Sequence, residues 1–167
     1  MTRGRLVVVP VPWMVSPSVP ELRISIAENG HTVVRVDVGS LPAHVDASLE
    51  TRGVEVTFHH GQWVRTYPAI DDIDPIREHT FDSSSIPYGA DDAPDALYRF
   101  REAWAQSGVC PDSRFYEVTG STWIADENAA RFGCRHFVIV GHDIWMELLA
   151  VDYEWGWTAP GARSIDL

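Results

Sequence analysis

Apolar runs and segments of helical periodicity follow one another along the first third of the chain. Residues 5–11 form a continuous apolar run, which is typical of a strand covered on both faces. Ser18 and Glu21 then form a capping box ahead of an apolar stripe at helical spacing, and residues 29–30, Asn-Gly, end that stripe. The pattern predicts a strand followed by a helix.

A β-hairpin that turns at residues 29–30 is the alternative for this segment. A two-residue turn sets Ile24 opposite Arg35 and Leu22 opposite Asp37, so that apolar side chains face charged ones across the strands. Because these pairs are unfavourable, the sequence favours the helix.

The same strand–helix pattern is repeated once. Residues 31–38 predict a strand, Ser40 can cap a helix over residues 41–51, and Gly53 ends that helix. Two such units in succession indicate a partly parallel sheet with helices packed on it.

Residues 54–67 alternate between apolar and polar side chains and predict a β-hairpin. The turn is expected at residues 60–61, His-Gly, and it gathers Val54, Val56 and Phe58 on one face. One face of this hairpin is therefore expected in the core and the other in water.

Residues 68–92 lack clear periodicity and predict a long acidic loop. A helix follows it as far as Ser107, with Gly108 as its stop signal. A short strand at residues 114–118 and a short helix within residues 120–133 come next.

The segment 134–157 predicts a second hairpin and contains the main chemical candidates. Gly141 and His142 suit a two-residue turn, and the resulting register sets His136 directly opposite Glu147 on one face. A three-residue loop instead separates the two side chains onto opposite faces.

Together these elements predict one α/β or α+β domain over residues 1–167. It has a mixed sheet of about seven strands and about four helices. The N-terminal part is βαβαβ-like, and antiparallel hairpins at residues 54–67 and 134–157 complete the sheet.

Charge and composition narrow the classes of function. The formal net charge is −11 and the pI is about 4.9. A surface with this charge repels phosphate groups, and we therefore expect neither nucleic acid nor a membrane as a partner. A basic protein partner or a cation is permitted, and the alternative is that the charge only keeps the protein soluble. The chain has no lysine, which excludes a side-chain Schiff base and a P-loop lysine.

The N-terminus and the cysteines indicate a cytoplasmic protein. Pro10 and Pro12 interrupt the first apolar run, which makes it a poor signal peptide, and no apolar stretch approaches the ~20 residues of a membrane helix. Cys110 and Cys134 are too few for a disulfide framework.

His136 and Glu147 are the candidate catalytic residues. A half-buried imidazole beside a carboxylate can act as a base and the group that orients it in proton transfer. The competing interpretation is a structural ion pair. We expect no metal and no other cofactor, because the spacing of Cys134, His142 and Asp143 around this pair matches no zinc motif.

The function expected from the sequence is an acidic binding module, adaptor- or immunity-like, that engages a protein partner. The acidic loop and the aromatic C-terminal strand are the expected contact regions. The candidate binding residues are Asp71, Asp72, Asp74, Trp145, Tyr153, Trp155 and Trp157. The alternatives are a small enzyme that uses the histidine–glutamate pair, and a small-ligand binder with a tryptophan-lined pocket.

Overall fold

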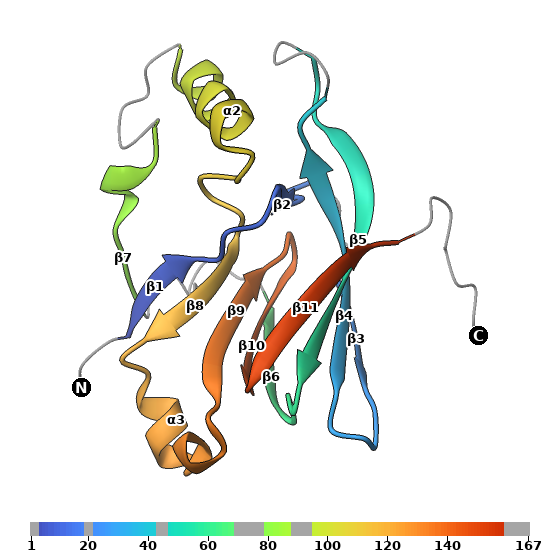
Figure 1. Ribbon diagram of the computed structural model, residues 1–167, viewed down its shortest axis with the longest axis vertical. Helices are drawn as coiled ribbons and strands as arrows, with labels where there is room; N and C mark the ends of the chain where they lie inside the picture. The colour runs from blue at the N-terminus through green and yellow to red at the C-terminus, as the bar shows by residue number, and fades with distance from the viewer. Residues whose placement is uncertain (1–3, 19–21, 43–46, 69–78, 88–94, 159–167) are drawn as a thin grey trace.

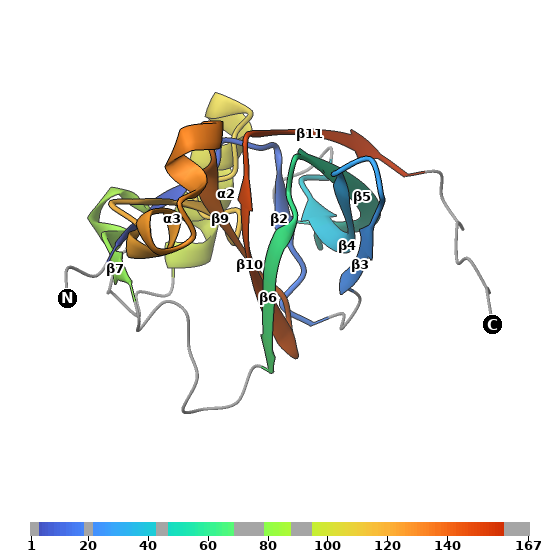
Figure 2. The same cartoon turned by 90° about the horizontal axis from the view of Figure 1, so that it is seen from below.

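The computed structural model of the protein describes residues 4–18, 22–42, 47–68, 79–87 and 95–158. It is mostly β, with 48% strand and 18% helix. Two sheets pack against each other as layers, and the helices lie outside them (Figure 1 and Figure 2). The expected α/β or α+β fold with a mixed sheet of seven strands and four helices is therefore wrong.

The first sheet has six strands in the order β6-β10-β9-β8-β1-β7. These strands are β6 (Trp63–Pro68), β10 (Ile144–Ala150), β9 (Arg135–Val140), β8 (Phe115–Thr119), β1 (Arg5–Val8) and β7 (Thr80–Phe81). Neighbouring strands are antiparallel except β1 and β7, which run parallel.

The second sheet is antiparallel and has the order β11-β5-β4-β2, with β3 also paired to β4. Its strands are β2 (Trp13–Val15), β3 (Leu22–Ile26), β4 (Thr32–Ser40), β5 (Glu50–His59) and β11 (Asp152–Trp157). Its inner face and that of the first sheet enclose the largest apolar core, in which Trp13 and Phe58 meet Phe115 and Phe137.

The described chain also contains two α-helices and two 3₁₀ turns. They are α2 (Ala96–Ser107), α3 (Thr122–Asp126) and the 3₁₀ turns η1 (Ser83–Ser85) and η2 (Ala129–Phe132). Figure 2 shows α3 on the side of β9 and β10 that faces away from the second sheet. Among the described residues, no helix has both the length and the apolar character that a membrane span requires.

The helix predicted from Ser18 onward is wrong, because this segment forms β3, antiparallel to β4. The hairpin turns through residues 27–31, which sets Ile24 opposite Val34. The two-residue turn considered above differs by one residue in register and sets Ile24 opposite Arg35. The longer turn thus removes the unfavourable pairs that argued for a helix.

The second predicted helix, at residues 41–51, is wrong as well. Strand β4 continues to Ser40 and forms a long antiparallel ladder with β5, while residues 43–46 lie outside the described part of the chain. Leu41 and Leu49 pack against the apolar cluster under α2. Their helical spacing therefore reflects a shared contact with α2 and not one face of a helix.

The predicted hairpin at residues 54–67 is wrong, whereas the predicted turn near Gly141 does join two antiparallel strands, β9 and β10. Strands β5 and β6 belong to different sheets, and so do β10 and β11; only β9 and β10 pair as expected. Val151 alone separates β10 from β11, and its N–H donates to the His59 carbonyl at 2.9 Å. The chain therefore crosses between the layers at Val151, and it also crosses between β5 and β6, where a hairpin turn was predicted.

The glycine stop signals predicted after residue 95 are present in the structure, although α3 ends at Asp126 and Gly133 follows η2. Helix α2 ends at Ser107, and Gly108 adopts a left-handed φ of 72° and donates its N–H to the Trp104 carbonyl. Gly133 ends η2 in the same way, with a φ of 73°. Glycine stop signals act locally, which is why these boundaries were predicted well.

Candidate functional site

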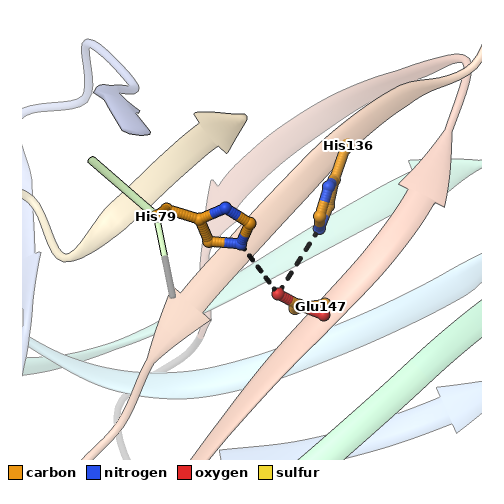
Figure 3. Close-up of side chains that lie close together, drawn as sticks. All are labelled: His79, His136 and Glu147. Atoms are coloured by element: carbon orange, nitrogen blue, oxygen red, sulfur yellow. Dashed lines mark hydrogen bonds and ion pairs between the residues drawn. The ribbon is translucent and has the colours of Figure 1, made fainter. Parts of the chain in front are cut away.

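Three side chains that are far apart in the sequence converge on the outer face of the first sheet (Figure 3). His79 directly precedes β7, His136 lies on β9 and Glu147 lies on β10. Glu147 Oε1 is 3.2 Å from His79 Nε2 and 3.7 Å from His136 Nε2. The carboxylate therefore lies between two imidazoles.

The turn between β9 and β10 is longer than predicted but keeps His136 and Glu147 on one face. Residues 141–143 connect the strands, where a two-residue turn was expected. In this register Glu147 lies opposite Val138. His136 is two residues before Val138 on β9, and its side chain is on the same face of the sheet. The two side chains are diagonal neighbours, a relation that still permits contact between long side chains.

His79 reaches this pair because β7 runs beside β1. The Thr80 N–H donates to the Gly4 carbonyl at 2.9 Å and anchors the start of β7. Gly4 also leaves room for the imidazole, since a Cβ at this position would overlap Val118 and lie 3.3 Å from His79 Nδ1. A glycine is thus required here by close packing.

The site is almost closed to water. His136 is 2% exposed and Glu147 is 6% exposed, and the His79 side chain is 13% exposed. Burial lowers the pKa of His136 to about 4, with smaller contributions in the same direction from His79 and Arg65 and an opposing one from Glu147. At neutral pH His136 is therefore an uncharged imidazole.

Ser121 orients the His136 ring. Its Oγ is 2.8 Å from His136 Nδ1, and although Ser121 is the N-cap residue of α3, its side chain makes no capping hydrogen bond. When the ring proton is on Nδ1 and is donated to Ser121, the Nε2 lone pair faces Glu147. Within the described chain, His136 Nε2 is a buried nitrogen that has no hydrogen-bond partner.

An aromatic cover lies over His136. The Trp123 ring on α3 meets the His136 ring edge-on, with centroids 5.2 Å apart. The Arg65 guanidinium of β6 lies 3.9 Å from the centre of the Trp123 ring. Glu127 Oε1 contacts both residues: it is 3.6 Å from the Arg65 guanidinium and accepts a hydrogen bond from Trp123 Nε1 at 3.2 Å. This cover keeps the imidazole in a dry environment.

The predicted aromatic binding residues are not gathered in one place. Trp145 is buried on the outer face of the first sheet, stacked on a tyrosine of β6. Tyr153 and Trp155 are partly buried against the core between the sheets, and Trp157 is 39% exposed beneath the Arg52 guanidinium. Of the predicted row on β11, Trp157 thus offers the most accessible ring.

Among the described residues, His142 and Asp143 do not join the cluster. Asp71, Asp72 and Asp74 lie outside the described residues. His142 and Asp143 pair with each other at 2.6 Å on the exposed β9–β10 turn. The protein-partner hypothesis, which depends on the acidic loop, stays a prediction.

A groove of about 420 Å³ lies beside the first residue of β6, Trp63. Trp63 and Phe132 supply aromatic rings to its wall, and Cys134 and Gln62 line it as well. Burial raises the pKa of the Cys134 thiol, so this cysteine is not activated as a nucleophile. The small-ligand hypothesis also stays a prediction.

Sequence reasoning missed His79. This residue falls in the segment without periodicity, and it reaches the site through a pairing of Arg5 with Thr80 that is distant in sequence. Local spacing carries no signal for such a contact.

No protein-family model, curated protein or solved structure matches the chain. The chemistry of the site is therefore the basis for a functional hypothesis. One nitrogen or oxygen from each of His79, His136 and Glu147 lies within 4.8 Å of the others, so the three residues could share a proton or hold one metal ion.

Proposed function

We propose that the protein binds a divalent transition-metal ion through His79, His136 and Glu147. The observation that supports this most strongly is the buried Nε2 of His136, which has no hydrogen-bond partner in the described structure and faces a carboxylate. A lone pair beside an anion is unfavourable where water is excluded. A cation between the two groups turns this repulsion into two attractive contacts.

The spacing of the ligand atoms suits a single ion. Bonds of about 2.0–2.2 Å at tetrahedral angles place ligand atoms about 3.3–3.6 Å apart. Glu147 Oε1 lies 3.2 Å and 3.7 Å from the two imidazole nitrogens. The ligand nitrogens of the two histidines lie within 4.8 Å of each other, and the proposal requires them to approach to this range when the ion binds.

The ligand set favours zinc and its first-row neighbours over magnesium or calcium, which prefer oxygen ligands. Three protein ligands also leave a coordination position open, as in catalytic zinc sites. An ion bound in this way supplies Lewis acidity towards water or a carbonyl oxygen. Ser121 holds the His136 ring through Nδ1, as hydrogen bonds to metal-ligating histidines commonly do.

Equilibrium dialysis against Zn²⁺ tests this proposal. Glu147→Gln removes the negative charge while keeping the volume, and His79→Gln removes one imidazole. Each variant is expected to lose one equivalent of bound Zn²⁺ relative to the unaltered protein, because two remaining protein ligands are too few to hold the ion firmly. Co²⁺ in the unaltered protein should show the intense visible absorption of a four-coordinate ion.

Glu102→Gln is the matched control, since Glu102 is an exposed carboxylate on α2. It should bind as many equivalents as the unaltered protein. Near-ultraviolet circular dichroism verifies that each variant keeps its aromatic packing. A folded Glu147→Gln protein that binds the same number of Zn²⁺ equivalents as the control contradicts the proposal, and so does an unaltered protein that binds none.

A further inference from the structure

A second group of histidines lies where the turn between β3 and β4 meets the end of β5. His31 Nδ1 and His59 Nδ1 are 3.1 Å apart, and the two rings are nearly perpendicular with centroids 4.9 Å apart. The His60 ring is 6.1 Å from the His31 ring. These residues belong to a different part of the fold from the buried site, at the end of the second sheet seen at the bottom of Figure 1.

A carboxylate lies near the far side of the His59 ring, and the turn fixes the backbone of His31. Glu154 Oε1 is 3.9 Å from His59 Nε2, and a carboxylate on that side favours the ring proton on Nε2. The Nδ1 lone pair of His59 then points towards His31. The turn fixes His31, because its N–H donates to Asn29 Oδ1 at 3.1 Å and its carbonyl accepts from the Ala27 N–H at 2.9 Å.

We propose that His31 and His59 form a surface chelate for a first-row transition-metal ion such as Ni²⁺, Cu²⁺ or Zn²⁺. Two metal–nitrogen bonds of about 2.0–2.1 Å that meet at an angle between roughly 90° and 110° place the nitrogens about 2.9–3.4 Å apart. The observed separation of 3.1 Å is within this range. His60 provides a further imidazole nearby, and water completes the coordination.

Accessibility and charge both favour ion capture at this place. The His59 side chain is 34% exposed and Glu154 is 72% exposed, so an ion can enter directly from solvent. The net charge of −11 attracts cations over a long range. Imidazole nitrogens select first-row transition metals rather than magnesium or calcium.

Chromatography of the untagged protein on immobilised Ni²⁺ tests this chelate alone, since a resin-bound ion can reach exposed histidines but cannot enter the closed His79–His136–Glu147 site. The unaltered protein is expected to be retained. His31→Gln and His59→Gln should each elute at a markedly lower imidazole concentration. His142→Gln is the control, because His142 is a histidine on the β9–β10 turn whose side chain is more exposed than that of His59, and it should elute like the unaltered protein.

Dialysis against Zn²⁺ supplies the second readout. His31→Gln should lose one equivalent whether or not the buried site binds metal, and the loss should add to that of Glu147→Gln when both sites are real. Equal retention and equal stoichiometry for His31→Gln and the control overturn the surface chelate while leaving the buried site unaffected. A similar loss of retention in His142→Gln also overturns it, because retention then depends on scattered surface histidines.

Discussion

Replacing Phe58 with alanine is expected to lower the free energy of unfolding by about 3–5 kcal/mol, because the change removes a fully buried ring and leaves a cavity. Phe58 has no exposed surface and lies where the two sheets meet. Its ring centroid is 5.9 Å from that of Phe115 and 5.5 Å from that of Phe137, both on the opposite sheet. Because the cavity left by the ring would lie between the two sheets, side chains of both sheets would have to move to fill it.

Urea unfolding followed by tryptophan fluorescence measures this loss. Phe132→Ala is the matched control, since Phe132 is an aromatic residue that is 50% exposed on η2. We expect that control to lose less than about 1 kcal/mol. A Phe58→Ala protein that is no less stable than the control would show that the two layers do not pack through this ring.

Acid should destabilise the metal-free protein through His136. Its pKa is about 4 in the folded protein and 6.5 in an ordinary environment. Between these values the unfolded chain binds a proton that the folded protein does not, so the free energy of unfolding falls as the pH is lowered from 6.5 to 4. The full change corresponds to about 3 kcal/mol, and above pH 6.5 this contribution is constant.

The groups that face His136 and shape this response are Glu147, His79 and Arg65. Unfolding by urea at a series of pH values, with a chelator present, measures the dependence. His136→Gln should flatten the profile between pH 6.5 and 4, whatever its absolute stability, while His142→Gln should keep the slope of the unaltered protein. An unchanged slope in His136→Gln would show that the imidazole is not buried uncharged.

The sequence predicted elements best where the signal was local. The stop signals at Gly108 and Gly133 were correct because a left-handed C-terminal residue depends only on its own turn. The prediction for the first third of the chain was wrong because the length of a turn sets the register of its strands. A two-residue turn sets Arg35 opposite Ile24, whereas the longer turn in the structure shifts the register by one residue and sets Val34 there. The assignment of strands to sheets also failed, because the crossing between β5 and β6 uses residues 60–61, His-Gly, which resemble a hairpin turn.

The candidate site was predicted in part. His136 and Glu147 were recognised because an imidazole and a carboxylate interrupt strands that are otherwise apolar, and a two-step error in register still leaves them on one face. Metal binding was not expected, because no zinc-like spacing surrounds them. The third group, His79, enters through a parallel pairing that no local pattern encodes.

The short strand β7 bears on how long an ion stays bound. It has two residues, pairs only with β1 among the described strands and lies at the edge of its sheet, directly after His79. Local opening of a weakly held edge requires far less free energy than global unfolding. We therefore expect the opening rate of this edge to set the residence time of the metal ion. The ion could then exchange with solvent while the core between the two sheets stays folded.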